Sequence, residues 1–330
     1  TSVAALSGAL AGFAGYFFEL VPPYKQLFGL AVLGVLGYIN YLGIRSSTRV
    51  INILTLAKLA PLLVFIIAGL MLCRWDVFHH AALPALKDYS RTVLICIFAF
   101  SGFEVIAIPG AEMTNPRGDI PKGILVGSGI TIAIYLFIQV IAVAALPGIA
   151  ASTRPLAEAA QNLLGTGGGV LLSAGAICST IGTLTSLLLV GPRILFAMGV
   201  AEQVPGMFSH INKRFRSPDV SLLAFLLVTA CLMLLSDFAN LATLSAMARL
   251  VTYAGSAIAL LILRKKDPQK SGFRAPGGPV LPILTVLVSL YLLSSATKDQ
   301  WIHGTGALIA GFLLYGITRL KTASRQTPQP

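Results

Sequence analysis

Long apolar runs recur along almost the whole chain, and short polar stretches separate them. A run of about 20 apolar residues predicts a helix that crosses the hydrocarbon core of a bilayer. The longest polar connections, residues 73–90, 199–218 and 264–278, are too short to fold around a core of their own. The pattern predicts an all-α polytopic membrane protein with a single transmembrane domain over residues 1–320 and ten spans, at residues 3–20, 25–44, 50–72, 91–112, 122–146, 167–198, 219–236, 239–263, 279–297 and 302–320.

Composition supports this class and excludes a water-soluble one. The 330 residues are 56% hydrophobic and only 11% charged, with a mean hydropathy of +0.84. A soluble globular protein needs far more charge to cover its surface. The net charge of +12 would suggest nucleic acid in a soluble protein, but here most basic residues lie in short loops between spans. No nucleic-acid partner is expected.

The basic residues also predict which loops face the cytoplasm. Loops rich in Lys and Arg face the cytoplasm. In this chain, every second loop is rich in these residues. The basic residues of these loops are Arg45 and Arg49; Arg117 and Lys122; Lys213, Arg214 and Arg216; Arg264, Lys265, Lys266, Lys270 and Arg274; and Arg319, Lys321 and Arg325. Both ends of the chain are therefore expected on the cytoplasmic side of the cell membrane. The polar tail, residues 321–330, is expected to be disordered. Because apolar sequence begins almost at Thr1, the true start is expected to lie outside this sequence.

The span at residues 91–112 contains a group of residues that disfavours a continuous helix. Glycine and serine weaken the helix at Ser101-Gly102, and Glu104 is costly in the membrane unless it is satisfied. An interruption there would offer carbonyl oxygens to an ammonium group and a half-helix N-terminus to a carboxylate. The alternative is a glycine kink in which Glu104 pairs with a neighbouring helix for packing.

Two further charges lie inside predicted spans. Lys58 is about two turns from the cytoplasmic end of its span, where it could extend to the interface or act in transport. Arg249 is expensive in the membrane unless it meets water or an acid. It is interpreted either as an extracellular gate residue that pairs with a carboxylate of another helix, or as a structural partner of Asp237 or a loop acid.

Three motifs resemble the amino acid/polyamine/organocation permease superfamily, in the family's order and over residues 25–300. The first resembles the sixth helix and its following loop, the second the end of the eighth helix, and the third the loop before the eleventh helix. Their residues are Phe98-Ala99-Phe100-Ser101-Gly102-Phe103-Glu104, Glu112, Asn115-Pro116-Arg117 and Asp119-Ile120-Pro121; Arg193-Ile194-Leu195-Phe196-Ala197-Met198, Val204-Pro205 and Ser217-Pro218; and Arg264, Pro268, Phe273-Arg274, Pro276-Gly277, Pro279 and Pro282.

The resemblance implies a twelve-helix fold with two inverted five-helix repeats, in which helices one and six are both unwound at the substrate site. The ten spans would be helices three to twelve, and the first two helices are not in this sequence. The implied substrate-binding residues are Phe98, Ala99, Phe100, Ser101, Gly102, Phe103 and Glu104. Phe98 would also close over the substrate as a gate, unless it is lipid-facing bulk.

Lys58 also acquires a role from the resemblance. Proton-coupled members carry a lysine on the fifth helix whose ammonium takes the place of a sodium ion. Protonated, Lys58 would join carbonyls of the first helix to hydroxyls of the eighth, for which Thr185 and Ser186 are the candidates. The alternative for these two residues is ordinary close helix packing.

The sequence thus predicts a secondary active transporter of amino acids, with the proton as coupling partner and symport preferred over exchange. An amino acid or polyamine exchanger using Glu104, and a non-transporting membrane sensor or truncated fragment, are the alternatives. An enzyme is not expected, because the chain has no HExxH, no GxSxG and no paired intramembrane aspartates. No metal or cofactor is expected, and the four cysteines have no CxxC spacing.

Overall fold

The computed structural model describes residues 1–18, 20–42, 48–73, 75–80, 86–104, 114–266 and 277–325. Within these ranges all regular secondary structure is helical, which confirms the predicted all-α class. Each predicted span falls on a helix. These helices are α1 (Ser2–Ala14), α2 (Lys25–Tyr41), α3 (Thr48–Leu72), α4 (Leu86–Ala99), α5 (Pro116–Ala145), α7 (Thr166–Val200), α8 (Asp219–Leu235), α9 (Phe238–Lys266), α10 (Val280–Ser294) and α11 (Lys298–Arg325).

Length and hydropathy mark three segments among the described residues as able to cross a membrane, namely Gly118–Ala145, Thr166–Val200 and Phe238–Lys266. Shorter apolar helices include α1, α8 and α10. The number of crossings, ten, stays a prediction.

Among the described residues, one α-helix was not predicted. The segment α6 (Pro155–Leu164) is too short for a span, yet it buries Ala157, Ala159 and Ala160. At the other end of the chain, α11 continues to Arg325, past the predicted start of a disordered tail at residue 321. Residues 326–330 lie outside the described ranges.

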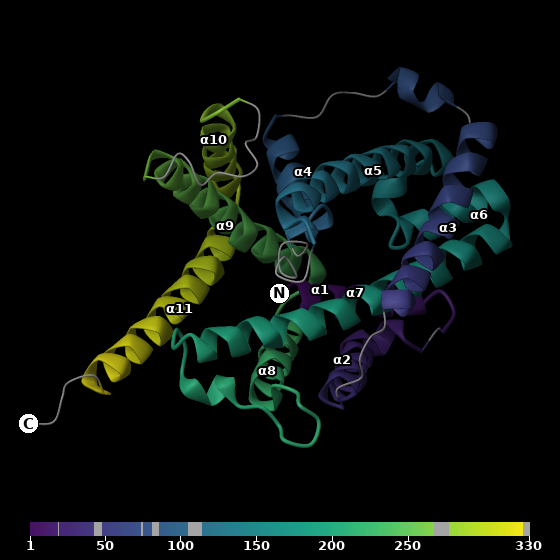
Figure 1. Ribbon diagram of the computed structural model, residues 1–330. Coiled ribbons are helices and arrows are strands. Elements are labelled where there is room, and N and C mark those ends of the chain that lie inside the picture. The colour runs from purple at the N-terminus through teal and green to yellow at the C-terminus, as the bar shows by residue number, and fades with distance from the viewer. Residues whose placement is uncertain are drawn as a thin grey trace, which may run out of the picture. The chain divides into compact units, whose positions relative to one another are not determined.

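The residues form two compact units that divide α5, α9 and α11 between them. The larger unit comprises Thr1–His79, Ile138–Leu241 and Thr305–Pro330. Its central element is α7, the long teal helix of Figure 1, which contacts α1, α2, α3, α6 and α8. Buried leucines of α1, α2 and α7 form its core, together with Val3: Leu10, Leu33, Leu36, Leu184 and Leu188. This core fixes which face of α7 is buried, and α3 packs against α7 as well.

The smaller unit comprises His80–Phe137 and Ala242–Gly304. Leu94 of α4 packs there against Leu250 of α9 and Leu292 of α10. Because Leu94 is in the turn of α4 before its last, this cluster holds the C-terminal end of α4 beside α9. The prediction of one domain over residues 1–320 stays a prediction.

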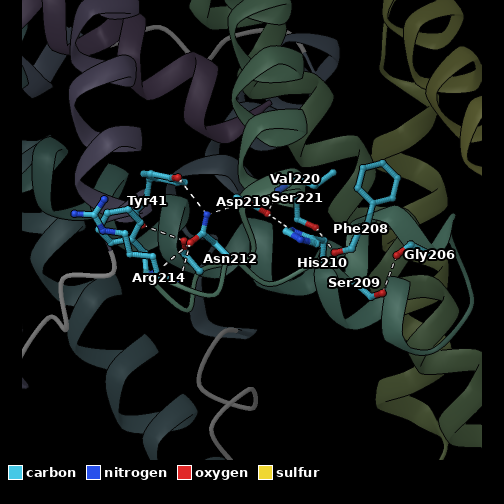
Figure 2. A network of polar contacts seen from close by, with 12 residues as sticks. Tyr41, Gly206, Phe208, Ser209, His210, Asn212, Arg214, Asp219, Val220 and Ser221 are labelled. Atoms are coloured by element: carbon cyan, nitrogen blue, oxygen red, sulfur yellow. Dashed lines mark hydrogen bonds and ion pairs between the residues drawn. The ribbon is translucent and has the colours of Figure 1, made fainter.

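The connection between α7 and α8 is ordered by a polar network (Figure 2). Asn212 lies between Tyr41 and Asp219, and its amide donates hydrogen bonds to the Tyr41 hydroxyl at 3.2 Å and to Asp219 Oδ2 at 3.3 Å. His210 Nδ1 contacts Asp219 Oδ1 at 2.7 Å, and the Ser217 hydroxyl donates to the Tyr41 carbonyl at 3.0 Å. The loop therefore ties the end of α2 to the beginning of α8.

Candidate functional site

The polar residues of the first candidate site lie where α4 stops. The helix ends at Ala99, inside an otherwise apolar run, and Gly102 has a φ of +114°, which favours glycine. The Ser101 hydroxyl donates to the Phe98 carbonyl at 2.6 Å, and Ser101 N–H donates to the same oxygen at 3.3 Å. The helix therefore stops two residues before the Ser101-Gly102 pair at which an interruption was predicted. Residues 105–113, including Glu112, lie outside the described residues.

Glu104 folds back over this break and gathers three donors. Gly102 N–H donates to Glu104 Oε2 at 3.0 Å, and the Tyr253 hydroxyl donates to the same oxygen at 3.4 Å. Arg249 forms an ion pair with Glu104 through the other oxygen, Oε1. Because Arg249 and Tyr253 are four residues apart on α9, they lie on one helix face. Arg249 thus pairs with a carboxylate outside α9, and because Glu104 lies beyond the end of α4, the pair fits both a gate residue and a structural partner of a loop acid.

The alternative partner, Asp237, has a different role. Its Oδ1 accepts the N–H of Asn240 at 2.9 Å, which satisfies a donor in the first turn of α9. Arg249 is about 16 Å along α9 from Phe238, at 1.5 Å per residue. Inside a candidate span such as α9, a paired guanidinium is far less costly than a free one.

Aromatic side chains surround the break. The Phe103 and Tyr253 rings are 5.7 Å apart, and the Phe100 and Tyr135 rings are 5.1 Å apart. The Tyr135 hydroxyl donates to the Ala99 carbonyl at 3.4 Å, so a freed helix-end acceptor finds a partner. The predicted gate residue Phe98 is half-buried in the last turn of α4.

Lys58 lies in the larger unit, and it lines a second candidate site. It borders a cavity of about 490 Å³ between α1, α3, α7 and the start of α6. Ser173 and Ser179 of α7 line the same cavity, and so does Arg154. The Arg154 guanidinium is occupied by the Gly15 carbonyl at 3.2 Å and by the face of Tyr16. Among the described residues, Lys58 has no hydrogen-bond or ion-pair partner.

The predicted hydroxyl partners of Lys58 do not line this cavity. Thr185 donates to the Ile181 carbonyl at 2.8 Å, and Ser186 donates to the Gly182 carbonyl at 3.0 Å, both within α7. Ser179 is the hydroxyl residue of α7 that the structure places there instead, with Ser173. The helix predicted to supply hydroxyl groups, α7, does place hydroxyl groups in the cavity. They come from Ser173 and Ser179, which are nearer the N-terminus of α7 than the predicted Thr185 and Ser186.

Close packing of α3 against α7 shapes the wall beside Lys58. A Cβ on Gly175 would lie 2.9 Å from Pro61 Cγ, so a larger residue cannot enter without displacement. Pro61 lacks an N–H, which leaves the Ala57 carbonyl without its helical partner one residue before Lys58. An acceptor of this kind, next to a cavity with a lysine, was not anticipated from the sequence.

Comparison with known proteins identifies relatives of one kind. A family model described as amino acid permease matches residues 1–311. The methylthioribose transporter of Bacillus subtilis (strain 168) is 26% identical over 94% of this chain and 67% of its own length. The serine/threonine exchanger SteT of the same organism is 29% identical over 91% of this chain and 71% of its own length. The human cationic amino acid transporter 4 is 29% identical over 72% of this chain, but only 39% of its own length. All of these relatives are transporters and none is an enzyme.

Proposed function

Because the chain belongs to the amino acid permease family, a family of multi-pass membrane proteins, we propose that it carries amino acids or related amines across the cell membrane by alternating access. In this proposal the ten predicted spans are helices three to twelve of the inverted-repeat fold, and the C-terminus is cytoplasmic. The substrate binds at the end of α4, where the residues from Phe98 to Glu104 provide backbone polar groups and aromatic walls.

One observation carries this proposal. The helix α4 stops at Ala99 although the surrounding sequence is apolar enough to continue it. An interrupted backbone at membrane depth is tolerated only where protein or a polar cavity receives it. The structure satisfies the carbonyl and N–H groups at this break with neighbouring side chains, and the proposal is that a small zwitterion takes the place of these partners when it binds.

Proton coupling is the second part of the proposal, and Lys58 is its agent. Lys58 borders a cavity together with Ser173 and Ser179, and this position between α3 and α7 is why its ammonium group is proposed to take part in coupling. Arg249 and Phe98 are proposed as gate residues. The ion pair of Arg249 is one of the contacts that join α9 to the end of α4, so breaking it would weaken their association.

Exchange is the nearest alternative, because one relative is named as a serine/threonine exchanger. A non-transporting sensor is a second alternative from another class. The names of the relatives cover methylthioribose, serine or threonine, and cationic amino acids, so they do not select a substrate for this chain.

The test is an uptake screen in proteoliposomes made with the complete gene product. Labelled amino acids and polyamines are offered with and without an inward proton gradient, and then with unlabelled substrate inside. Accumulation driven by the gradient supports symport, whereas uptake that requires internal substrate supports exchange. Binding without any accumulation would contradict transport and favour a sensor.

A further inference from the structure

The described polar groups at the end of α4, up to Glu104, carry no net charge. Glu104 contributes one negative charge and Arg249 one positive charge, and the two are ion-paired. The other groups that contact the carboxylate, Gly102 N–H and the Tyr253 hydroxyl, are neutral. A glutamate alone would attract a cationic guest, but the pair presents a balanced field.

Both oxygens of Glu104 are already occupied. Oε1 faces Arg249, while Oε2 accepts two hydrogen bonds. Oε1 could accept one further hydrogen bond, but a second ammonium or guanidinium placed there would lie beside the Arg249 guanidinium and be repelled by its like charge unless Arg249 leaves. Arg249 is only 20% exposed, and its Nε is buried without a partner among the described residues. Displacing it would leave a charge unpaired at membrane depth, which is strongly unfavourable.

We infer that the protein selects amino acids with uncharged side chains, and that Arg249 determines this selectivity by neutralising Glu104. The inference rests on the proposed function, since it assumes that substrate binds at the end of α4. A neutral amino acid brings its own opposite charges in equal number, so it enters without disturbing the pair. A lysine, arginine or polyamine brings an extra positive charge, for which the described residues at the end of α4 offer no free carboxylate.

The experiment measures competition for uptake of labelled L-alanine in proteoliposomes of the complete gene product. Unlabelled L-serine and L-leucine should inhibit the wild type, whereas L-lysine, L-arginine and putrescine should require at least about tenfold higher concentrations. Arg249→Gln exposes the carboxylate, so the concentration of L-lysine needed for half inhibition should fall about tenfold or more, equivalent to 1.4 kcal/mol. Arg249→Lys, which keeps the charge, should retain the wild-type preference.

Arg264→Gln is the matched control, because it removes the same charge from the last turn of the same helix. Its preference should equal that of the wild type. Glu104→Gln provides a second test if Arg249→Gln does not fold. It leaves Arg249 unpaired, so inhibition by L-glutamate should appear.

Three results would overturn the inference while transport itself stands. They are wild-type uptake inhibited equally by neutral and cationic amino acids, an equal effect of Arg249→Gln and Arg264→Gln, and an unchanged charge preference in both Arg249→Gln and Glu104→Gln. If the wild type accumulates no amino acid at all, the proposed function fails instead. The two failures are therefore distinguishable.

Discussion

Replacing Asn212 by alanine should loosen the connection between α7 and α8 and lower the stability of the larger unit. The side chain makes four hydrogen bonds. It donates to the Tyr41 hydroxyl and to Asp219, and its Oδ1 accepts Arg214 N–H at 2.9 Å and Phe215 N–H at 3.2 Å. The two backbone bonds of Asn212, with Ser217 and Arg216, are retained in the variant.

The magnitude follows from these bonds. A hydrogen bond contributes about 0.5 to 1.5 kcal/mol, and those at 3.2–3.3 Å in a half-exposed loop belong at the low end. Water can also replace part of what is lost. We expect a loss of about 2 kcal/mol in the free energy of unfolding, or a fall of roughly 4 °C in melting temperature.

The assay is thermal unfolding of purified protein in detergent, followed by loss of the monodisperse species. Asn162→Ala is the control, because its side chain makes one hydrogen bond, to the Ala145 carbonyl at 3.1 Å. It should lose about 0.5 kcal/mol. Equal melting temperatures for the two variants would refute the reasoning, because the four bonds of Asn212 would then have no cumulative effect.

Three other substitutions test other parts of the structure. Lys58→Ala should abolish uptake driven by a proton gradient in proteoliposomes while the melting temperature is kept, and unchanged coupling would contradict its role. Gly102→Ala should reduce uptake and cost about 1 to 2 kcal/mol, since Gly102 has a φ of +114°; Gly129→Ala, in open space, is its control. Leu184→Ala should lower the free energy of unfolding by about 2 to 5 kcal/mol because Leu184 is fully buried, whereas Leu313→Ala, at an exposed position, should change little.

Hydrophobic pattern predicted the helices well because lipid-length apolar runs leave few alternatives to a helix. The span at residues 167–198 falls on α7, Thr166–Val200, with ends that differ by at most two residues. The search for apolar runs of membrane-spanning length did not detect α6. This helix has only ten residues and buries one face of alanines, so it is too short to be counted as a span. Its local signals, Pro155 at the first helical position and Gly165 after the last, were readable in the sequence.

The hydroxyl groups near Lys58 show that the face of a helix is easier to predict from sequence than the position along its axis at which a contact forms. Ser179 lines the cavity, and the predicted Ser186 is seven residues later, which is two helical turns and therefore the same face. The two positions are about 10.5 Å apart along α7. Periodicity identifies a face, but the vertical register of α3 against α7 depends on contacts such as Pro61 with Gly175. Those contacts become visible only once the helices are packed.

The charge around Glu104 depends on one contact close in sequence and on another that is distant in sequence. Gly102 and Glu104 are two residues apart, so the backbone at Gly102 alone brings its N–H to the carboxylate. That part was readable as a break beside an acid. Arg249 is far along the chain, and only the packing of α9 beside the end of α4 decides that it neutralises Glu104 and that Asp237 does not. The charge selectivity proposed above therefore depends on the packed pair, and a sequence match at the glutamate alone would suggest the opposite preference.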